Sequence, residues 1–364
     1  MWSGCNQASE APPEKEEIPV LKEVFKDAFL IGAALNRSQI SGEDVHGVEL
    51  VKRQYNTITP ENILKWENVH PEPDRYDFEA ADRYVQFGEE NGMFIVGHTL
   101  VWHNQTPDWV FLDDDGNRLE REGLLERMRE HIHTVVGRYK GRIHGWDVVN
   151  EALNDDGSLR QTRWLETIGD DYISKAFEFA READPDAELY YNDYSLENPE
   201  KRNGAVELIQ KLQNDGVPVT GVGTQGHFSL DWPSLEEVEA TITAFADLGI
   251  DVMVTELDID VLPPVSEGQG ADISFNTEPA DSLNPYTGGL PDSVQQTLAQ
   301  RYKDLFGIYN KHHDVIKRIT FWGVSDGDSW KNNWPVRGRT NYPLLFDRNH
   351  QPKPAFYSVI EIPE

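Results

Sequence analysis

The sequence predicts an α/β fold, a single (β/α)8 or TIM barrel, and three observations lead to it. Short apolar runs typical of strands alternate with segments of helical spacing, which favours a parallel sheet. About eight such units fit into the 364 residues, as a closed barrel of eight strands requires. The sequence has no glycine-rich phosphate loop after the first predicted strand, so an open doubly wound sheet is less well supported.

The predicted elements follow one another in regular alternation. The strands are expected at residues 30–35, 57–59, 94–99, 143–149, 188–192, 220–224, 252–255 and 319–324. The clearest helix is expected at 124–139, where Leu124, Met128 and Ile132 recur on one face. Further helices are expected at 172–183, 204–214, 235–248 and 294–309.

Composition places most of the chain in one folded domain, predicted at 20–364, behind an N-terminal arm at 1–19. The arm is polar and holds two prolines within QASEAPPEKEE at 7–17. Cys5 is the only cysteine, so no disulfide forms within the chain. Its context, Ser-Gly-Cys-Asn, resembles the end of a bacterial lipoprotein signal, so Cys5 is either a lipid anchor or an incidental cysteine.

The charge of the chain argues against several classes of partner. A formal net charge of −31 disfavours nucleic acid and anionic membranes. No apolar run is as long as the roughly 18–20 residues of a membrane span. The excess of acid is either a solvated surface or an adaptation to high salt.

Two glutamates close apolar runs that read as strands. Glu151 ends WDVVNE at 146–151, and Glu256 lies in VMVTELD at 252–258. Parallel barrels place their active sites at the C-terminal ends of the strands. Two carboxylates at that face are what cleavage of a glycosidic bond needs, one as proton donor and one as nucleophile or base.

Other strand ends carry amide, imidazole, lysine or tryptophan side chains. Such a ring suits a sugar, because flat aromatic faces meet its C–H side and polar groups meet its hydroxyls. The residues of this kind, together with the carboxylates and the tyrosine at the same strand ends, are Glu61, Asn62, Lys65, His98, Trp102, Asn150, Tyr194, Gln225, His227, Asp258, Trp322 and Trp330.

From about residue 20 to the C-terminus, the chain resembles glycoside hydrolase family 10, which includes many endo-β-1,4-xylanases. The motifs, in the order of the family, are ENILKWE (61–67), GHTLVWH (97–103), WDVVNEA (146–152), TQGH (224–227), TELDI (255–259) and WGVSDGDSW (322–330). The resemblance implies hydrolysis of internal xylan bonds with retention and without a cofactor, with Glu151 as acid/base and Glu256 as nucleophile. Their carboxyl groups are then expected about 5–5.5 Å apart.

The resemblance also implies roles for the surrounding residues. His227 is expected to donate to Glu256 and to be oriented by Asp258, and Asn150 to bind the sugar 2-hydroxyl. Lys65, His98 and Gln225 are expected to contact the sugar in the cleavage subsite, and Glu61 and Asn62 the next sugar. Trp102, Trp322 and Trp330 would wall the site. Tyr194 is expected to stack a sugar on the leaving-group side, and Asp147 to tune the hydrogen bonds of Glu151.

Several alternatives remain open at this point. The residues His98, His103 and His227, with Asp258 or Asp260, could bind zinc, although their spacing matches no known signature. His131 and His133 are interpreted as surface residues, and a calcium site at 113–115 is less favoured than a solvated acidic turn. The long segment 262–291 either lines a substrate cleft or is an insertion. Another β-glycanase and a non-catalytic, lectin-like protein are the competing functions.

The same reasoning predicts partners and location. Xylan and xylo-oligosaccharides are the expected partners of a monomer that is secreted, periplasmic or held at the cell surface.

Overall fold

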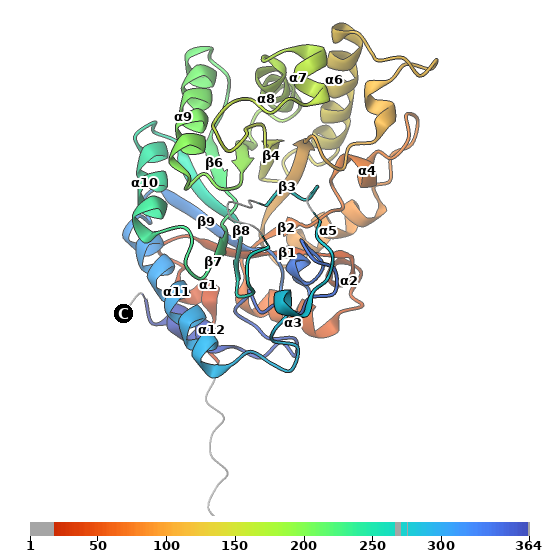
Figure 1. The fold of residues 1–364 in the computed structure, drawn as a ribbon. Coiled ribbons are helices and arrows are strands. Elements are labelled where there is room, and N and C mark those ends of the chain that lie inside the picture. The colour runs from red at the N-terminus through yellow and green to blue at the C-terminus, as the bar shows by residue number, and fades with distance from the viewer. Residues whose placement is uncertain (1–17, 266–270, 275, 363–364) are drawn as a thin grey trace, which may run out of the picture.

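Eight parallel strands close into a barrel in the computed structural model, which describes residues 18–265, 271–274 and 276–362 (Figure 1). The strands follow the order β6-β5-β4-β3-β2-β1-β9-β8, and β6 also pairs with β8, which closes the ring. The predicted single (β/α)8 barrel is therefore confirmed. Residues 1–17 of the predicted arm, Cys5 included, lie outside the described residues.

The barrel strands lie close to their predicted positions. They are β1 (Leu30–Leu35), β2 (Thr57–Pro60), β3 (Phe94–Val101), β4 (Gly145–Asn150), β5 (Glu188–Asp193), β6 (Gly221–Thr224), β8 (Asp251–Asp260) and β9 (Ile316–Phe321). Every residue of β2, β4 and β6 is buried. Burial on both faces is typical of a parallel sheet covered by helices and explains the nearly continuous apolar runs.

The strands around Glu256 differ from the prediction. β8 continues to Asp260, and a short strand, β7 (His227–Ser229), pairs with its extension so that His227 lies opposite Asp258. β9 ends at Phe321 rather than at residue 324. Gly323 has φ +136°, a backbone conformation outside the range of a strand, so Trp322 begins a loop.

Helices surround the barrel on its outside (Figure 1). They are α1 (Leu21–Val24), α2 (Arg37–Ser41), α3 (Val45–Gln54), α4 (Trp66–Val69), α5 (Glu79–Glu90), α6 (Arg121–Arg138), α7 (Arg163–Ile168), α8 (Tyr172–Ala183), α9 (Pro199–Asn214), α10 (Leu235–Ala246), α11 (Asp292–Lys311) and α12 (Pro354–Ile360). Short 3₁₀ turns are η1 (Asp108–Phe111), η2 (Asp281–Leu283) and η3 (Trp330–Asn332). Within the described part of the chain, none of the helices is long and apolar enough to cross a membrane.

Local sequence explains where several helices begin. Ser234 and Glu237 form a capping box at the start of α10, each satisfying a backbone N–H that the helix leaves free. At α9 the Asn198 side chain accepts from the N–H of Glu200, and Pro199 occupies the first helical position, where its missing N–H costs nothing. The first turn of α9 therefore has a fixed position next to the end of β5.

The interpretation of His131 as a surface residue is wrong. His131 is fully buried in α6, and its ring stacks on Trp66 with a centroid distance of 3.6 Å. Its Nδ1 atom lies 3.1 Å from Nδ1 of His70. His133, two positions on, points elsewhere, is partly exposed and bonds Glu182. Residues two apart on a helix face different sides, so one of such a pair can point into the core while the other meets solvent.

Candidate active site

A cavity of about 170 Å³ lies at the C-terminal ends of the barrel strands. It is bounded by side chains from six of the eight strands or the loops that follow them, as the sequence predicts for a sugar site. The lining residues are Glu61, Asn62, Lys65, His98, Trp102, Gln105, Asn150, Glu151, Gln225, His227, Glu256, Ala271, Ile273, Trp322 and Trp330. Twelve of the fifteen residues predicted for the site are among them, and Asp147, Tyr194 and Asp258 are not.

Glu151 follows the last residue of β4 and is held by three neighbours. Its backbone adopts φ +57°, and its N–H donates to the carbonyl of Asn192 at 2.9 Å. The indole of Trp102 donates to Oε2 at 2.8 Å, and the Gln225 amide donates to Oε1 at 3.1 Å. Burial and then the negative charge of Asp193 raise the pKa of Glu151 to about 7, against the lowering effect of these two hydrogen bonds. The carboxyl group can therefore hold a proton near neutral pH.

Glu256 lies within β8 and meets a different set of neighbours. Asn192 donates to Oε1 at 2.8 Å, and Nε2 of His227 lies 3.2 Å from Oε2. Burial alone would raise the pKa of Glu256, but the hydrogen bond from His227 and the nearby charge of His98 lower it overall. At a pH at which Glu151 still holds its proton, Glu256 is therefore ionised.

His227 carries the charge that favours the ionised form of Glu256. Its Nδ1 atom lies 2.9 Å from Oδ1 of Asp258, on the side of the ring away from Glu256. Burial alone would lower the pKa of His227, but Asp258 and Glu256 outweigh this effect and raise the pKa to about 9. The indole of Trp330 donates to the other oxygen of Asp258 at 2.7 Å and fixes that carboxylate. Asp258 therefore orients His227 from behind the cavity wall.

A chain of amides links the two glutamates. The Asn192 amide donates to Glu256 and, at 2.8 Å, to Oδ1 of Asn150. The Gln225 amide lies 3.4 Å from the same Asn150 oxygen and also donates to Glu151. Both carboxyl groups therefore belong to one buried network and face one cavity.

A second network holds the end of the cavity formed by the residues after β2. Nζ of Lys65 donates to Asn62 and to Gln105, each at 2.9 Å. Burial lowers the pKa of Lys65, and the charges of Glu256, Glu61 and Glu151 oppose this effect. Burial raises the pKa of Glu61, against the charge of Lys65. The network presents fixed hydrogen-bonding groups to whatever occupies this end.

The expected role of Asp147 is not supported. Its carboxylate accepts no hydrogen bond from the Glu151 network; Oδ2 instead lies 2.9 Å from Nδ1 of His98. Asp147 is paired in register with His98 across β3 and β4, which brings its carboxylate to that ring, while Asn150 lines the cavity. His98 lies edge-on to Trp322, with ring centroids 5.3 Å apart. Asp147 therefore positions His98.

Tyr194 also differs from its expected role. Its side chain is buried, with 3% of the residue exposed, and it does not line the cavity. Nζ of Lys201 lies 3.5 Å from the ring centroid, and the hydroxyl accepts from Arg160 at 2.6 Å. One ring face is occupied by an ammonium group and the residue is almost fully buried, so the ring is not placed to stack on a sugar.

The long segment after β8 contributes to the cavity. Ala271 and Ile273 line it, while Asp272 and Ser274 line a neighbouring cavity. Asp272 also forms an ion pair of 3.1 Å with Arg160. Of the two sequence interpretations of 262–291, the lining of a substrate cleft is the one that these residues favour.

Sequence reasoning missed three contributors. Asn192 closes the strand expected at 188–192 and has no role assigned from the sequence, yet it bonds Glu256 directly. Gln105 joins the Lys65 network, and Asp193 is the strongest charge acting on Glu151. Asn192 and Asp193 end β5, and Asn192 pairs with Asn150, the last residue of β4 before Glu151; this register is the signal that could have found both.

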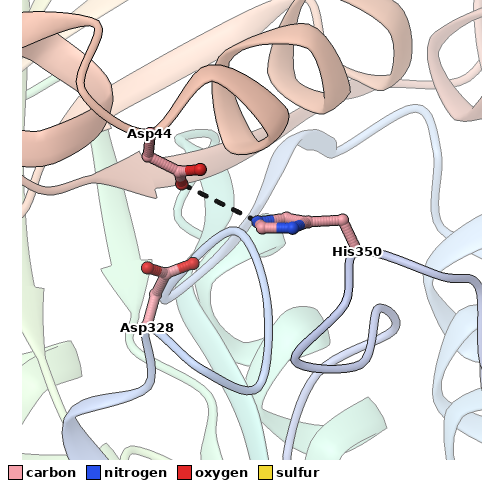
Figure 2. Close-up of side chains that lie close together, drawn as sticks. All are labelled: Asp44, Asp328 and His350. Carbon is pink, nitrogen blue, oxygen red and sulfur yellow. Dashed lines mark ion pairs between the residues drawn. The ribbon is translucent and has the colours of Figure 1, made fainter.

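Among the described residues, the one group of three His, Cys, Asp or Glu side chains close enough to share a metal ion is Asp44, Asp328 and His350 (Figure 2). The Gln39 amide donates to both carboxylates, at 2.7 and 3.2 Å, so hydrogen bonds already hold this group together. None of the three lines the cavity. The zinc alternative at His98, His103 and His227 finds no support in this part of the chain.

Comparison with known proteins agrees with this geometry. The sequence model of glycosyl hydrolase family 10 matches residues 20–362. Endo-1,4-beta-xylanase A of Xylanibacter ruminicola is 48% identical over 346 residues, 95% of this chain and 94% of that protein. Beta-1,4-xylanase of Dictyoglomus thermophilum is 46% identical over 347 residues, 95% of this chain and 91% of that protein.

Solved structures give the same result. A GH10 endoxylanase retrieved from sugarcane soil metagenome superposes with a TM-score of 0.92 at 48% identity, covering 94% of this chain and 99% of that one. Xylanase XynB from Paenibacillus barcinonensis, complexed with a conduramine derivative, superposes with a TM-score of 0.87 at 41% identity, covering 95% and 99%. The chain is thus a glycoside hydrolase and belongs to glycosyl hydrolase family 10.

Proposed function

We propose that this enzyme is a retaining endo-1,4-β-xylanase that hydrolyses internal β-1,4-xylosidic bonds of xylan and xylo-oligosaccharides. One observation carries the mechanism: two equally buried carboxyl groups share a cavity, and the pKa of Glu151 is raised to about 7 while that of Glu256 is lowered. Double displacement needs one protonated and one ionised carboxyl group. The substrate, xylan, is inferred from the names of the relatives, which are xylanases.

In the first step the Glu256 carboxylate attacks the anomeric carbon of the xylosyl unit. The bond to the leaving oxygen breaks, and Glu151 transfers its proton to that oxygen, so the shortened chain leaves as an alcohol. The product is a glycosyl ester on Glu256 and an ionised Glu151. Glu256 loses its charge in this step, so its hydrogen bonds with His227 and Asn192 are no longer bonds to a charged group.

In the second step water attacks the same carbon. Glu151, now a carboxylate, takes a proton from the water, and the ester bond to Glu256 breaks with its electron pair returning to the carboxylate. Both glutamates end in their starting charge states. Two inversions at one carbon give net retention of configuration.

The sugar contacts are proposals from the family resemblance, consistent with the cavity. Asn150 binds the 2-hydroxyl next to Glu256, and Lys65, His98 and Gln225 contact the xylose in the cleavage subsite. Glu61 and Asn62 contact the next sugar. The walls are Trp102, Trp322 and Trp330, which line the same cavity.

The stereochemistry of the first product tests this mechanism. Proton NMR of xylohexaose hydrolysis should show the β-anomer of the new reducing end before mutarotation. Release of the α-anomer first would contradict retention and the nucleophilic role of Glu256.

Substrate class is tested separately. Reducing sugar should appear rapidly from xylan and far more slowly from carboxymethylcellulose and mannan. Preference for either of the other polymers would make the enzyme a different β-glycanase. Binding of xylan without reducing-sugar release would favour the lectin-like alternative.

The remaining proposals concern the state of the protein. We propose a monomer that acts outside the cytoplasm, with Cys5 as its point of lipid attachment. Intact mass of the native protein tests the anchor: the mass of an unmodified cysteine would end this part of the proposal.

A further inference from the structure

A fully buried ion pair lies next to the acid/base. Asp193 ends β5, and Lys201 lies in the first turns of α9; both side chains have 0% exposure, and Nζ lies 2.9 Å from Oδ1. The same ammonium group lies over the ring of Tyr194. Removing two charges from water costs about as much as their attraction returns, so such a pair contributes little net stability. The charges of the pair nevertheless act on the ionisable groups around it.

The two oxygens of Asp193 face different neighbours. Oδ1 meets Lys201 and accepts from the N–H of Tyr194 at 2.9 Å. Oδ2 accepts from the hydroxyl of Tyr191 and lies 3.4 Å from the N–H of Leu153, two residues past Glu151. The oxygen without the lysine is therefore the one turned towards the segment that carries the acid/base.

Backbone pairing fixes the distance between Asp193 and Glu151. The N–H of Glu151 donates to the carbonyl of Asn192, and the N–H of Gln225 donates to the carbonyl of Asp193 at 3.0 Å. The Gln225 side chain then returns to Glu151. Asp193 is thus tied to the acid/base through both neighbouring strands, β4 and β6.

We propose that Asp193, held in place by Lys201, is a positioning residue whose fixed negative charge keeps Glu151 protonated in the resting enzyme and makes it a strong base in the second step. This inference rests on the proposed function, because it assumes that Glu151 is the acid/base. Among the charges that act on Glu151, Asp193 comes before Glu256 in raising its pKa. The interior is a low-dielectric medium, in which a fixed charge acts more strongly than in water.

The charge of Asp193 differs from that of Glu256 in one respect. Glu256 loses its charge when the glycosyl ester forms, and Asp193 does not. Glu151 must give up its proton in the first step and accept one in the second. A permanent negative charge beside it raises its basicity for the attack of water, after the contribution of Glu256 has gone.

Other titratable groups surround the two carboxyl groups and must be considered in a pH experiment. Asp193 faces Lys201, Arg160, Tyr172, Tyr191 and Tyr194, and Glu151 faces Lys65, Arg160, Tyr194 and Glu256. Burial raises the pKa of each tyrosine well above the working range. Glu256 titrates on the acid side.

The test compares pH profiles of kcat/KM. The variants are Asp193→Asn, the double variant Asp193→Asn/Lys201→Met, which leaves no unpaired buried ammonium, and Asp193→Glu, which retains the charge. The matched control is Asp155→Asn: this carboxylate lies 3.7 Å from the same Nζ but is 53% exposed. Xylohexaose needs a proton on its leaving group, and 2,4-dinitrophenyl β-xylobioside does not.

On xylohexaose the double variant should move the basic limb down by about one pH unit, because loss of a nearby negative charge lowers the pKa of Glu151. Asp193→Glu and Asp155→Asn should leave it within roughly 0.3 unit of the parent. With the dinitrophenyl substrate, kcat of the double variant should fall about 2- to 5-fold, since the base is weaker, while kcat/KM stays near the parent value.

Three results separate the outcomes. A basic limb that stays in place in the double variant overturns the inference, as does an equal shift in Asp155→Asn. Asp193→Asn could lose activity only because its melting temperature falls. If the basic limb of the kcat/KM profile is then unchanged for the folded protein, Asp193 has a structural role alone and the inference is overturned. If the parent enzyme shows the same basic limb in kcat/KM on the dinitrophenyl substrate, Glu151 is not the proton donor, and the proposed function fails first.

Discussion

Glu151, directly after β4, and Glu256, within β8, are the same residue type in opposite protonation states. Glu151 is 4% exposed and Glu256 is 5% exposed, so burial alone gives both a tendency to stay protonated. Around Glu151 the neighbours are two neutral donors and the charge of Asp193. Around Glu256 they are His227, Asn192 and the nearby His98. The difference in protonation state therefore comes from the neighbouring groups and not from the degree of burial.

A neighbouring carboxylate such as Glu256 favours the protonated form of the acid/base. In the structure, burial and Asp193 contribute more to the pKa of Glu151 than Glu256 does. The two carboxyl groups are tuned largely by separate surroundings, so each can be altered with a limited effect on the other. The following experiments use that separation.

The largest effect is expected from Glu256→Ala, which removes the attacking group. We expect kcat on xylan to fall on the order of 10⁵-fold, the scale on which loss of a nucleophile acts in enzymes with covalent intermediates. Azide should enter the vacated space and attack the anomeric carbon of an activated β-xyloside. This single displacement gives an α-glycosyl azide, which NMR identifies. A β-glycosyl azide would reverse the roles of the two glutamates.

Glu151→Ala should cost less, because general acid catalysis contributes about 10²- to 10⁴-fold. The loss should be concentrated in substrates with poor leaving groups such as xylohexaose. With 2,4-dinitrophenyl β-xylobioside the first step should proceed, and a burst of dinitrophenol should precede slow turnover. Equal slowing of both steps on this substrate would count against the acid/base role.

His227→Gln should act on Glu256 alone. It removes the His227 imidazole, whose pKa is about 9 and whose positive charge favours ionised Glu256. The pKa of Glu256 should rise, so the acid limb of the pH profile should move to higher pH while the basic limb stays in place. A hydrogen bond to a charged group is worth about 1.5–3 kcal/mol, so kcat/KM should fall roughly 10- to 150-fold. A shift of the basic limb instead would show that the two surroundings are coupled.

The fold could be predicted from the sequence because its signals are periodic and repeated. Eight alternating units, each with a nearly continuous apolar strand, specify a covered parallel barrel. The details that escaped prediction depend on contacts between distant segments. β7 exists because His227–Ser229 meets the extension of β8, and His131 is buried because Trp66 lies against it.

The candidate site shows the same limit. Residues at strand ends could be predicted, because parallel strands bring their C-terminal ends to one face. The orientation of a side chain at that face could not. Asp147 and Tyr194 both belong to family motifs or strand ends, yet one bonds His98 and the other lies under Lys201. Asp193 follows Asn192 in the chain, and its influence on Glu151 depends on burial that the sequence does not display.

The smallest effect, with a sign opposite to that of the double variant Asp193→Asn/Lys201→Met, is expected from Trp102→Phe. The indole N–H donates to Oε2 of Glu151 at 2.8 Å and lowers its pKa, and phenylalanine removes that donor while retaining an aromatic wall. A neutral hydrogen bond contributes about 0.5–1.5 kcal/mol, which corresponds to an upward shift of the basic limb by about 0.4–1.1 pH units. The acid limb should stay in place, because Glu256 accepts no hydrogen bond from Trp102. Profiles of kcat/KM on xylohexaose measure both limbs, and a downward movement of the basic limb would mean that the wall, rather than the hydrogen bond, controls the protonation of Glu151.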